Sequence, residues 1–264
     1  MDFEIFFMLP ILFTIGRFNV YSFGFFLALS FLLSTFIVWK FAKEDLKETE
    51  YFDAFLYTNI VVLAFARIFY IITHFSDFDF NPLRLIVVRE APGLSLLGGL
   101  IGGAVFLFFY ARRKKYDFLH LADLFSLAFS FALIFAKIGE QLGGAGYGRE
   151  TRFFLGVKVV GLTGIRHPTE LYEALLYILL SIILLVLYKK SVRRKIPSGV
   201  VSYLFVILTC FIFFGLEFLK ERSVYWSILS ERQIGSVLIF LLISIPVLRK
   251  IIIAKWLSKK KKNI

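Results

Sequence analysis

The stretch Leu119–Gly148, LHLADLFSLAFSFALIFAKIGEQLGGAGYG, decides the fold class of this chain. Its first part, up to Phe135, is predominantly apolar and suits the hydrocarbon core of a bilayer. Lys137, Glu140 and Gln141 then follow at spacings of three and four residues, so they share one face of a helix. Ionisable groups inside a membrane usually face a bundle interior or a water-filled cavity. The stretch therefore predicts a membrane helix that carries a functional site.

Four glycines follow this helix in the sequence, Gly143, Gly144, Gly146 and Gly148. Glycine adopts positive φ without strain and lets the backbone approach a ligand closely, which favours a binding loop. Alternatively, the glycines form an ordinary loop, and Lys137 and Glu140 extend their charged ends to the membrane interface. These residues alone leave both interpretations open.

The composition indicates a helical membrane protein. The chain has 264 residues, of which 59% are hydrophobic, with 34 phenylalanines and a mean hydropathy of +0.79. Several runs reach the roughly 20 apolar residues that a helix needs to cross a bilayer. We therefore expect an all-α, polytopic integral membrane protein with a single transmembrane domain over residues 1–264.

Cysteine and histidine usage excludes several kinds of site. Because Cys210 is the only cysteine, an internal disulfide and a cysteine-based metal site are both excluded. No pair of histidines has the spacing of metal ligands. We therefore expect neither a metal ion nor another cofactor.

The apolar runs predict about seven transmembrane helices, at residues 20–40, 52–74, 96–112, 119–140, 170–188, 199–219 and 234–255. The loops after the first, third and fifth of these, together with the C-terminal tail, hold 19 basic residues, and the opposite side holds ten. The positive-inside rule then places the C-terminus in the cytoplasm and the N-terminus outside.

This distribution of charge also bears on partners. The net charge of +12 comes from short loops between apolar runs, so we expect membrane lipids and no nucleic acid as partners. Residues 141–169 form a long external loop, and long loops are often functional, so the chemistry is expected on the outer face. Residues 1–19 are expected to form an external interfacial segment, and residues 256–264 a basic cytoplasmic tail that faces anionic lipid.

Arg67 lies within the second predicted span. A guanidinium inside the membrane cannot lose its charge, so it must pair or face water. It suits a phosphate, which it can grip with two hydrogen bonds. A structural pair with Asp53, Glu140 or Glu217 is the alternative.

The third predicted span carries two interleaved glycine pairs, Gly98, Gly99, Gly102 and Gly103. Their four-residue spacings make a flat face on which another helix can pack closely. The functional alternative is the wall of a cavity that is open to a lipid headgroup.

The densest polar cluster is Arg166–Glu173, RHPTELYE. Thr169, directly after a proline, indicates the start of the fifth span. The two glutamates of the cluster favour a helix start through the macrodipole. Arg166 and His167, just outside that start, could hold an anionic headgroup.

The sixth and seventh predicted spans add three polar positions. Glu217 follows a strongly apolar run, and Lys220 lies three residues further on. This carboxylate is either paired with that lysine or available as a proton acceptor. Gln233 opens the last span and is expected to cap or line it.

Together these motifs resemble the prolipoprotein diacylglyceryl transferase family. The matching pieces extend over nearly the whole chain: Tyr21–Gly24 (YSFG), Ala66–Tyr70 (ARIFY), Leu94–Gly103 (LSLLGGLIGG), Leu121–Asp123 (LAD), Ala136–Gly148, Arg166–Glu173, Gly215–Lys220 (GLEFLK) and Gln233–Ser236. Their order and spacing match seven spans with the N-terminus outside.

The resemblance implies an enzyme of the bacterial inner membrane whose active site faces the outer leaflet. Such enzymes transfer the diacylglyceryl group of phosphatidylglycerol to the lipobox cysteine thiol of a prolipoprotein and release glycerol phosphate. The reaction needs a base, because the thiolate is the good nucleophile. It also needs cations or backbone N–H groups for the departing phosphate.

Several family positions differ in this chain. Where the family has a histidine, a tyrosine and an arginine, this sequence has Leu97, Phe23 and Phe213. The family's Gly-Arg-x-Gly-Asn is replaced by Ala136–Glu140, and its Asn-Gly-Glu by Gly143–Ala145. These differences support a second hypothesis, a catalytically impaired paralogue that binds phospholipid or lipoprotein without transfer. A small-solute transporter is less favoured, because no inverted repeat is visible.

On this resemblance the candidate catalytic residues are Lys137, Glu140 and Glu217. Either glutamate would take the thiol proton, and Lys137 with Arg67 would hold the phosphate. The candidate phospholipid-binding residues are Arg67, Gly98, Gly99, Gly148, Arg166, His167, Tyr172, Glu173 and Gln233. We expect Arg67, Lys137, Glu140 and Glu217 to converge on one cavity that is open to lipid.

Overall fold

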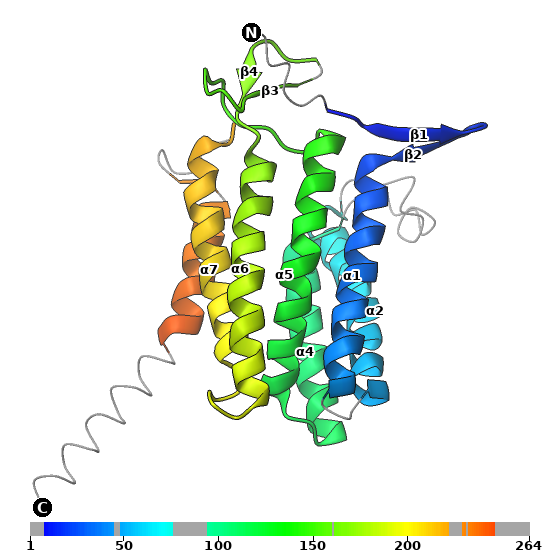
Figure 1. Ribbon diagram of the computed structural model, residues 1–264, viewed down its shortest axis with the longest axis vertical. Coiled ribbons are helices and arrows are strands. Elements are labelled where there is room, and N and C mark those ends of the chain that lie inside the picture. Colours follow the sequence, from blue (N-terminus) through cyan, green and yellow to red (C-terminus); the bar gives the residue numbers. More distant parts are fainter. Residues whose placement is uncertain are drawn as a thin grey trace, which may run out of the picture. The chain divides into compact units, whose positions relative to one another are not determined.

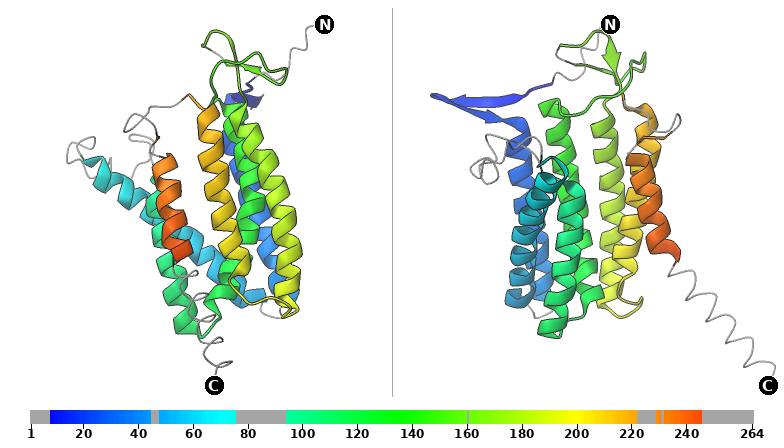
Figure 2. Two further views of the ribbon diagram at one scale, coloured as in Figure 1. Left: turned by 90° about the vertical axis from the view of Figure 1, so that its left-hand side faces the viewer. Right: turned by 180° about the vertical axis from the view of Figure 1, so that it is seen from behind.

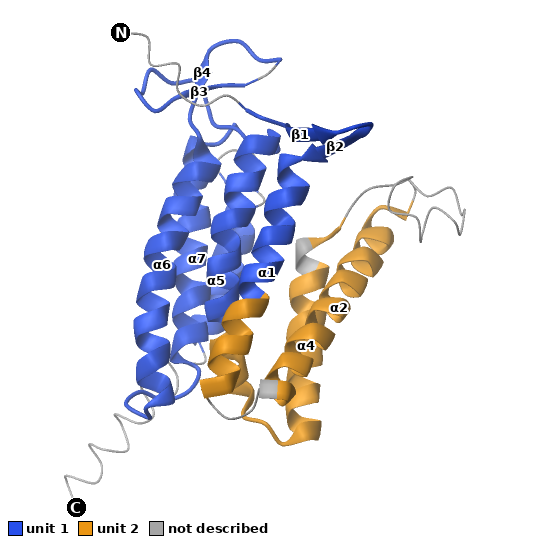
Figure 3. Cartoon of the chain, turned by 45° about the vertical axis from the view of Figure 1, so that its right-hand side comes forward, with its two compact units in different colours: residues 1–34, 126–264 blue, residues 35–125 orange. Residues whose placement is uncertain are grey.

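The computed structural model describes residues 8–44, 48–75, 94–159, 161–221, 229–230 and 232–245. The chain divides into two compact units, which Figure 3 colours separately. Unit 1 comprises residues 1–34 and 126–264, and unit 2 comprises residues 35–125. Each unit is considered by itself.

The described residues are mainly helical (Figure 1). In chain order the helices are α1 (Ser22–Glu44), α2 (Glu48–Thr73), α4 (Leu96–Lys114), α5 (Phe118–Gly143), α6 (Thr169–Val192) and α7 (Val200–Leu216), followed by the short 3-10 helix η2 (Glu217–Leu219). One more apolar helix extends from Arg232 to Ile245.

Among the described residues, five helical segments are long and apolar enough to cross a membrane: Ser22–Glu44, Thr49–Thr73, Phe118–Gly143, Thr169–Val192 and Val200–Leu219. These segments confirm the expected class, a helical membrane protein. The expected span 96–112 corresponds to α4, and the helix Arg232–Ile245 covers the first part of the expected span 234–255. Because the rest of that span lies outside the described residues, the count of seven stays a prediction.

Polar side chains and one left-handed residue mark the ends of these apolar helices. The Ser95 hydroxyl accepts a hydrogen bond from the Gly98 N–H at 3.3 Å and so caps the start of α4. Lys115 ends α4 with a φ of 58°. The Asp117 carboxylate accepts a bond from the Leu119 N–H at 3.0 Å and caps α5. The loops therefore begin where side chains satisfy the last free backbone groups.

In unit 2, α2 and α4 pack together through the glycine face. A Cβ atom added at Gly98 would lie 2.3 Å from the Phe69 Cβ, and one added at Gly102 would lie 2.3 Å from the Phe65 Cγ. Side chains at these positions would push the helices apart. The glycines therefore serve the close helix packing that their spacing predicts, and a role in lipid binding stays a prediction.

In unit 1, α5, α6 and α7 lie side by side, as Figures 1 and 2 both show. The Ser181 hydroxyl of α6 donates to the Ser130 hydroxyl of α5 at 3.0 Å, and both side chains are buried. The aromatic rings of Phe129 and Phe205 link α5 to α7, with centroids 5.9 Å apart. The core of this unit therefore runs along α6, whose Tyr177 is fully buried.

Two small antiparallel sheets were not expected from the sequence. Strands β1 (Ile11–Ile15) and β2 (Phe18–Tyr21) form a hairpin, whose turn uses Gly16 at a φ of 60°. Strands β3 (Val157–Lys158) and β4 (Ile165–Arg166) lie in the loop between α5 and α6. Phe18 is 79% exposed, which suits the interfacial segment predicted for residues 1–19. Of that segment, residues 1–7 lie outside the described part of the chain.

Candidate active site

A cluster of buried charges lies where the end of α5 meets the start of α6 in unit 1. The Lys137 ammonium nitrogen lies 2.6 Å from the Glu140 Oε2, 3.0 Å from the Glu170 Oε2 and 2.9 Å from the Glu173 Oε2. The Lys137 side chain is only 9% exposed, and that of Glu173 is 1% exposed. A lysine can be kept charged at this depth because three carboxylates surround it.

A second lysine joins the same cluster from the segment after η2. The Lys220 ammonium nitrogen lies 2.7 Å from the Glu170 Oε1 and 2.5 Å from the Glu173 Oε1. Each of these carboxylates therefore bridges two lysines, one with each oxygen. The cluster holds two cations and three carboxylates, which leaves one excess negative charge.

Glu217 lies at the end of α7, three residues before Lys220, and is 6% exposed. The sequence left two alternatives, a pair with Lys220 or a proton acceptor. The pairing alternative is wrong, because Lys220 binds the two carboxylates of α6 instead. Within the described part of the chain, the Glu217 carboxylate makes no hydrogen bond or ion pair. A buried carboxylate without a partner is costly to keep charged, so taking up a proton would be favourable.

An aromatic ring borders the cluster at one of the divergent positions. The Lys137 ammonium nitrogen lies 6.0 Å from the centre of the Phe213 ring, one turn before Glu217 on α7. The resemblance expects an arginine there. The ring can attract the ammonium weakly through its π face, but it supplies no hydrogen bond to a phosphate.

The external segment holds Lys220 in place through its backbone. The Gly148 N–H donates to the His167 carbonyl at 3.0 Å, and the Arg149 N–H donates to the Leu219 carbonyl at 2.8 Å. A Cβ atom added at Gly148 would lie 2.7 Å from the His167 carbonyl oxygen and 2.8 Å from that of Leu219. Only glycine fits between these two backbones, which ties the loop after α5 to the residues before Lys220.

The predicted external mouth residues are engaged with protein groups. Arg166 forms ion pairs with Glu221 and, at 3.8 Å, with Glu150. Its guanidinium also donates to the Gly148 carbonyl at 3.3 Å. The His167 Nδ1 lies 3.3 Å from the Tyr172 hydroxyl oxygen, and both side chains are half-buried. Contact of these residues with a headgroup stays a prediction.

The remaining predicted residues lie away from the charge cluster or in the other unit. Gln233 is fully buried; its amide N–H donates to the Phe214 carbonyl at 3.2 Å, and its amide oxygen accepts from the Ser230 N–H at 3.1 Å. Arg67 is half-buried on α2 of unit 2, and the buried Gly98 and Gly99 belong to α4 of the same unit. The predicted convergence of Arg67 with the other charged residues therefore stays a prediction.

Sequence reasoning did not place Lys220 and Glu170 among the candidate site residues, although both belong to the cluster. A signal existed for each. Glu170 lies three residues before Glu173, and so on the same face of α6. Lys220 is a basic residue directly after an apolar run. Neither signal says which carboxylate a given lysine will bind.

The fold and the site together define a helical membrane protein with a buried, charged site near the ends of its spans. The family model described as prolipoprotein diacylglyceryl transferase matches residues 10–249. The chain therefore belongs to the prolipoprotein diacylglyceryl transferase family.

Individual relatives agree with this assignment. The chain is 30% identical to the phosphatidylglycerol–prolipoprotein diacylglyceryl transferase of Clostridioides difficile, over 95% of this chain and 96% of the relative. It is also 30% identical to the protein of that name from Geobacter sulfurreducens, over 84% of this chain and 85% of the relative. A third, from Idiomarina loihiensis, is 31% identical over 84% of each chain.

Proposed function

We propose that this protein transfers the diacylglyceryl group of phosphatidylglycerol to the lipobox cysteine thiol of a prolipoprotein. The family match over residues 10–249 carries this proposal. In the transfer, a carbon–sulfur bond forms to the glyceryl carbon and that carbon's bond to the phosphate oxygen breaks. The phosphate leaves as glycerol phosphate, and the thiol proton passes to a base on the enzyme.

Glu217 is the base that we favour. Its carboxylate is 6% exposed and makes no hydrogen bond or ion pair among the described residues, so no protein cation competes for it. The alternative base, Glu140, is already bound to the Lys137 ammonium at 2.6 Å. A base that gains a proton in a buried site also relieves its own desolvation cost.

Lys137 and Arg67 are the proposed cations for the phosphate. Lys137 is held by three carboxylates, so the phosphate must replace one of them. Glu140 is the candidate to be replaced, because its side chain is 31% exposed whereas those of Glu170 and Glu173 are 3% and 1% exposed. Glu140 would then act as a gate on the cation.

The other proposed substrate-binding residues form the surroundings of this site. They are Gly98, Gly99, Gly148, Arg166, His167, Tyr172, Glu173 and Gln233. We place the enzyme in the bacterial inner membrane with seven spans, the N-terminus outside and the site toward the outer leaflet. The excess of basic residues in alternate loops supports this orientation.

The test uses the purified full-length protein, phosphatidylglycerol and a synthetic lipobox peptide, with the peptide mass followed over time. We expect a mass gain of one diacylglyceryl group that requires the peptide cysteine. Glu217→Gln should lower the rate by about 10²-fold or more, since this is the usual contribution of a general base. Glu150→Gln, at a side chain that is 63% exposed, is the matched control and should keep the wild-type rate.

Absence of any mass gain, in protein that is folded and binds phosphatidylglycerol, would overturn the transferase and leave the binding-only paralogue. A mass gain that survives Glu217→Gln would instead remove Glu217 from the mechanism and keep the enzyme.

A further inference from the structure

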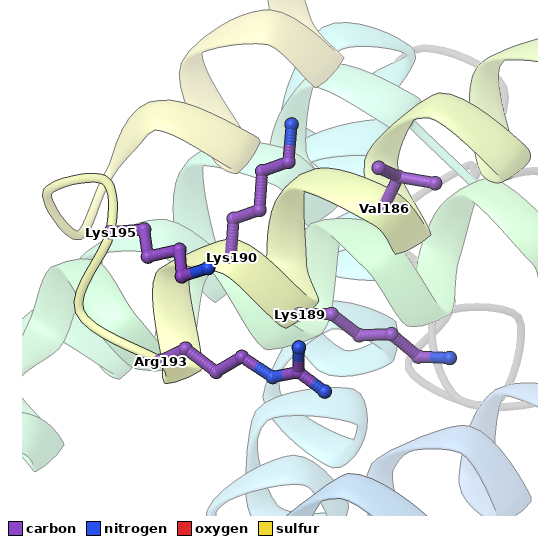
Figure 4. A pocket seen from close by; sticks show the side chains of 5 residues that line it. All are labelled: Val186, Lys189, Lys190, Arg193 and Lys195. Carbon is purple, nitrogen blue, oxygen red and sulfur yellow. The ribbon is translucent and has the colours of Figure 1, made fainter.

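A cavity of about 230 Å³ lies at the C-terminal end of α6, far from the charge cluster. The residues that line it are Val186, Lys189, Lys190, Arg193 and Lys195 (Figure 4). At ~1.5 Å per helical residue, about 30 Å of helix separates it from Glu170 at the other end of α6. The cavity therefore belongs to the opposite membrane surface from the candidate active site.

The backbone after α6 folds back and brings the last lysine beside the helix. The Arg193 N–H donates to the Lys189 carbonyl at 3.4 Å, and the Lys195 N–H donates to the Lys190 carbonyl at 2.9 Å. Arg194, at a φ of 54°, makes the reversal between them. In Figure 4 the Lys195 side chain extends toward the base of Lys190, and the Arg193 guanidinium extends toward Lys189.

The charge around this cavity exceeds what the helix end needs. A helix C-terminus carries roughly half a negative charge, which one cation can balance. Here four basic side chains line one cavity, and no acidic residue is among the lining residues. Residues 186–199 contain no aspartate or glutamate either. Four neighbouring cations repel one another unless an anion lies between them.

We propose that this cavity binds a phosphate group, carried by an anionic phospholipid or free in solution. The ammonium groups lie on flexible four-carbon stems and can turn onto the phosphate oxygens, while the planar Arg193 guanidinium grips two oxygens at once. Val186 and the lysine stems give the apolar contact that a lipid glycerol and its first methylenes need. This site is separate from the proposed catalytic site, and neither depends on the other.

The test measures phosphatidate binding to the full-length protein in detergent by native mass spectrometry, with phosphatidylcholine as the neutral comparison. The variant Lys189→Gln/Lys190→Gln/Arg193→Gln/Lys195→Gln removes the cations of the cavity. The control Arg112→Gln/Arg113→Gln/Lys114→Gln/Lys115→Gln removes as many exposed cations at the end of α4. We expect the affinity for phosphatidate to fall at least about tenfold in the first variant and to stay at the wild-type value in the control.

Equal loss in both variants, or equal binding of phosphatidylcholine by the wild type, would overturn the site. An excess of inorganic phosphate decides the source. Displacement of phosphatidate only at high excess assigns the cavity to lipid, whereas a phosphate affinity as high as that of phosphatidate assigns it to the free anion. If the fourfold variant does not fold, Lys189→Arg/Lys195→Arg must retain binding and Arg193→Gln alone must weaken it.

Discussion

The two buried lysines and the carboxylates of α6 depend on one another. Lys137 and Lys220 both contact Glu170 and Glu173, and the side chains of these glutamates are 3% and 1% exposed. Removing one member of a buried ion network leaves an uncompensated charge, which is far costlier than losing a surface pair. The cluster is therefore expected to behave as a single unit in mutagenesis.

Lys220→Met tests this unit. It should lower the free energy of unfolding by about 3 kcal/mol, because two carboxylates then share the single Lys137. Thermal unfolding in detergent measures the effect. Lys158→Met, at an exposed lysine of β3, is the control and should change the midpoint little.

A second variant separates charge balance from lost packing. Glu173→Gln in the Lys220→Met background restores the balance of charges, so it should recover part of the lost stability. If the double variant is as unstable as the sum of the single variants, the ion network is not the cause.

At the scale of helices, the contact between α2 and α4 depends on the absence of side chains. The glycines of α4 lie where an added Cβ would meet Phe65 and Phe69 at 2.3 Å. In a membrane the hydrophobic effect does not hold helices together, so close van der Waals packing of small residues takes its place. This packing keeps α2, with Arg67 on it, against α4.

Gly102→Ala should therefore destabilise the protein by about 1–3 kcal/mol through overpacking. Gly215→Ala is the matched control, because an added Cβ at that position of α7 meets nothing within 4 Å. Alanine favours a helix over glycine by about 1 kcal/mol, so the control should be neutral or stabilising. Equal thermal shifts for the two variants would contradict the packing role of Gly102.

At the scale of the whole molecule, orientation in the membrane is the property that decides where the substrates meet. The loop with β3 and β4 lies at the end of α6 that carries the charge cluster, and the basic cavity lies at the other end. The positive-inside rule assigns the basic end to the cytoplasm. The lipobox cysteine would then meet the enzyme on the outer side.

Single cysteines test this orientation after Cys210, a buried residue of α7, has been replaced by alanine. In intact cells, a membrane-impermeant maleimide should label Lys158→Cys and leave Ser198→Cys unlabelled. Opening the cells should allow labelling at both positions. Labelling of Ser198→Cys alone in intact cells would reverse the predicted orientation.

Several features of this fold could be predicted from local sequence. The apolar runs predicted residues 119–140 and 170–188 as helices, and the structure has Phe118–Gly143 and Thr169–Val192. The start at Thr169 followed from the proline before it. The β1–β2 hairpin was missed, although Gly16 between two β-rich runs is a usable turn signal. A mixed, partly apolar segment does not reveal by itself whether it lies on a membrane or pairs with its neighbour.

The sequence by itself determined the membrane class, the main helices and the presence of charges inside them. Hydrophobicity and spacing are local properties, so they need no knowledge of distant neighbours. Only the tertiary structure decided that Lys220 binds Glu170, 50 residues away, and so leaves Glu217 without a partner. Ion pairing in a low-dielectric interior depends on distances of a few ångströms. Those distances are set by how α5, α6 and the segment after α7 pack together.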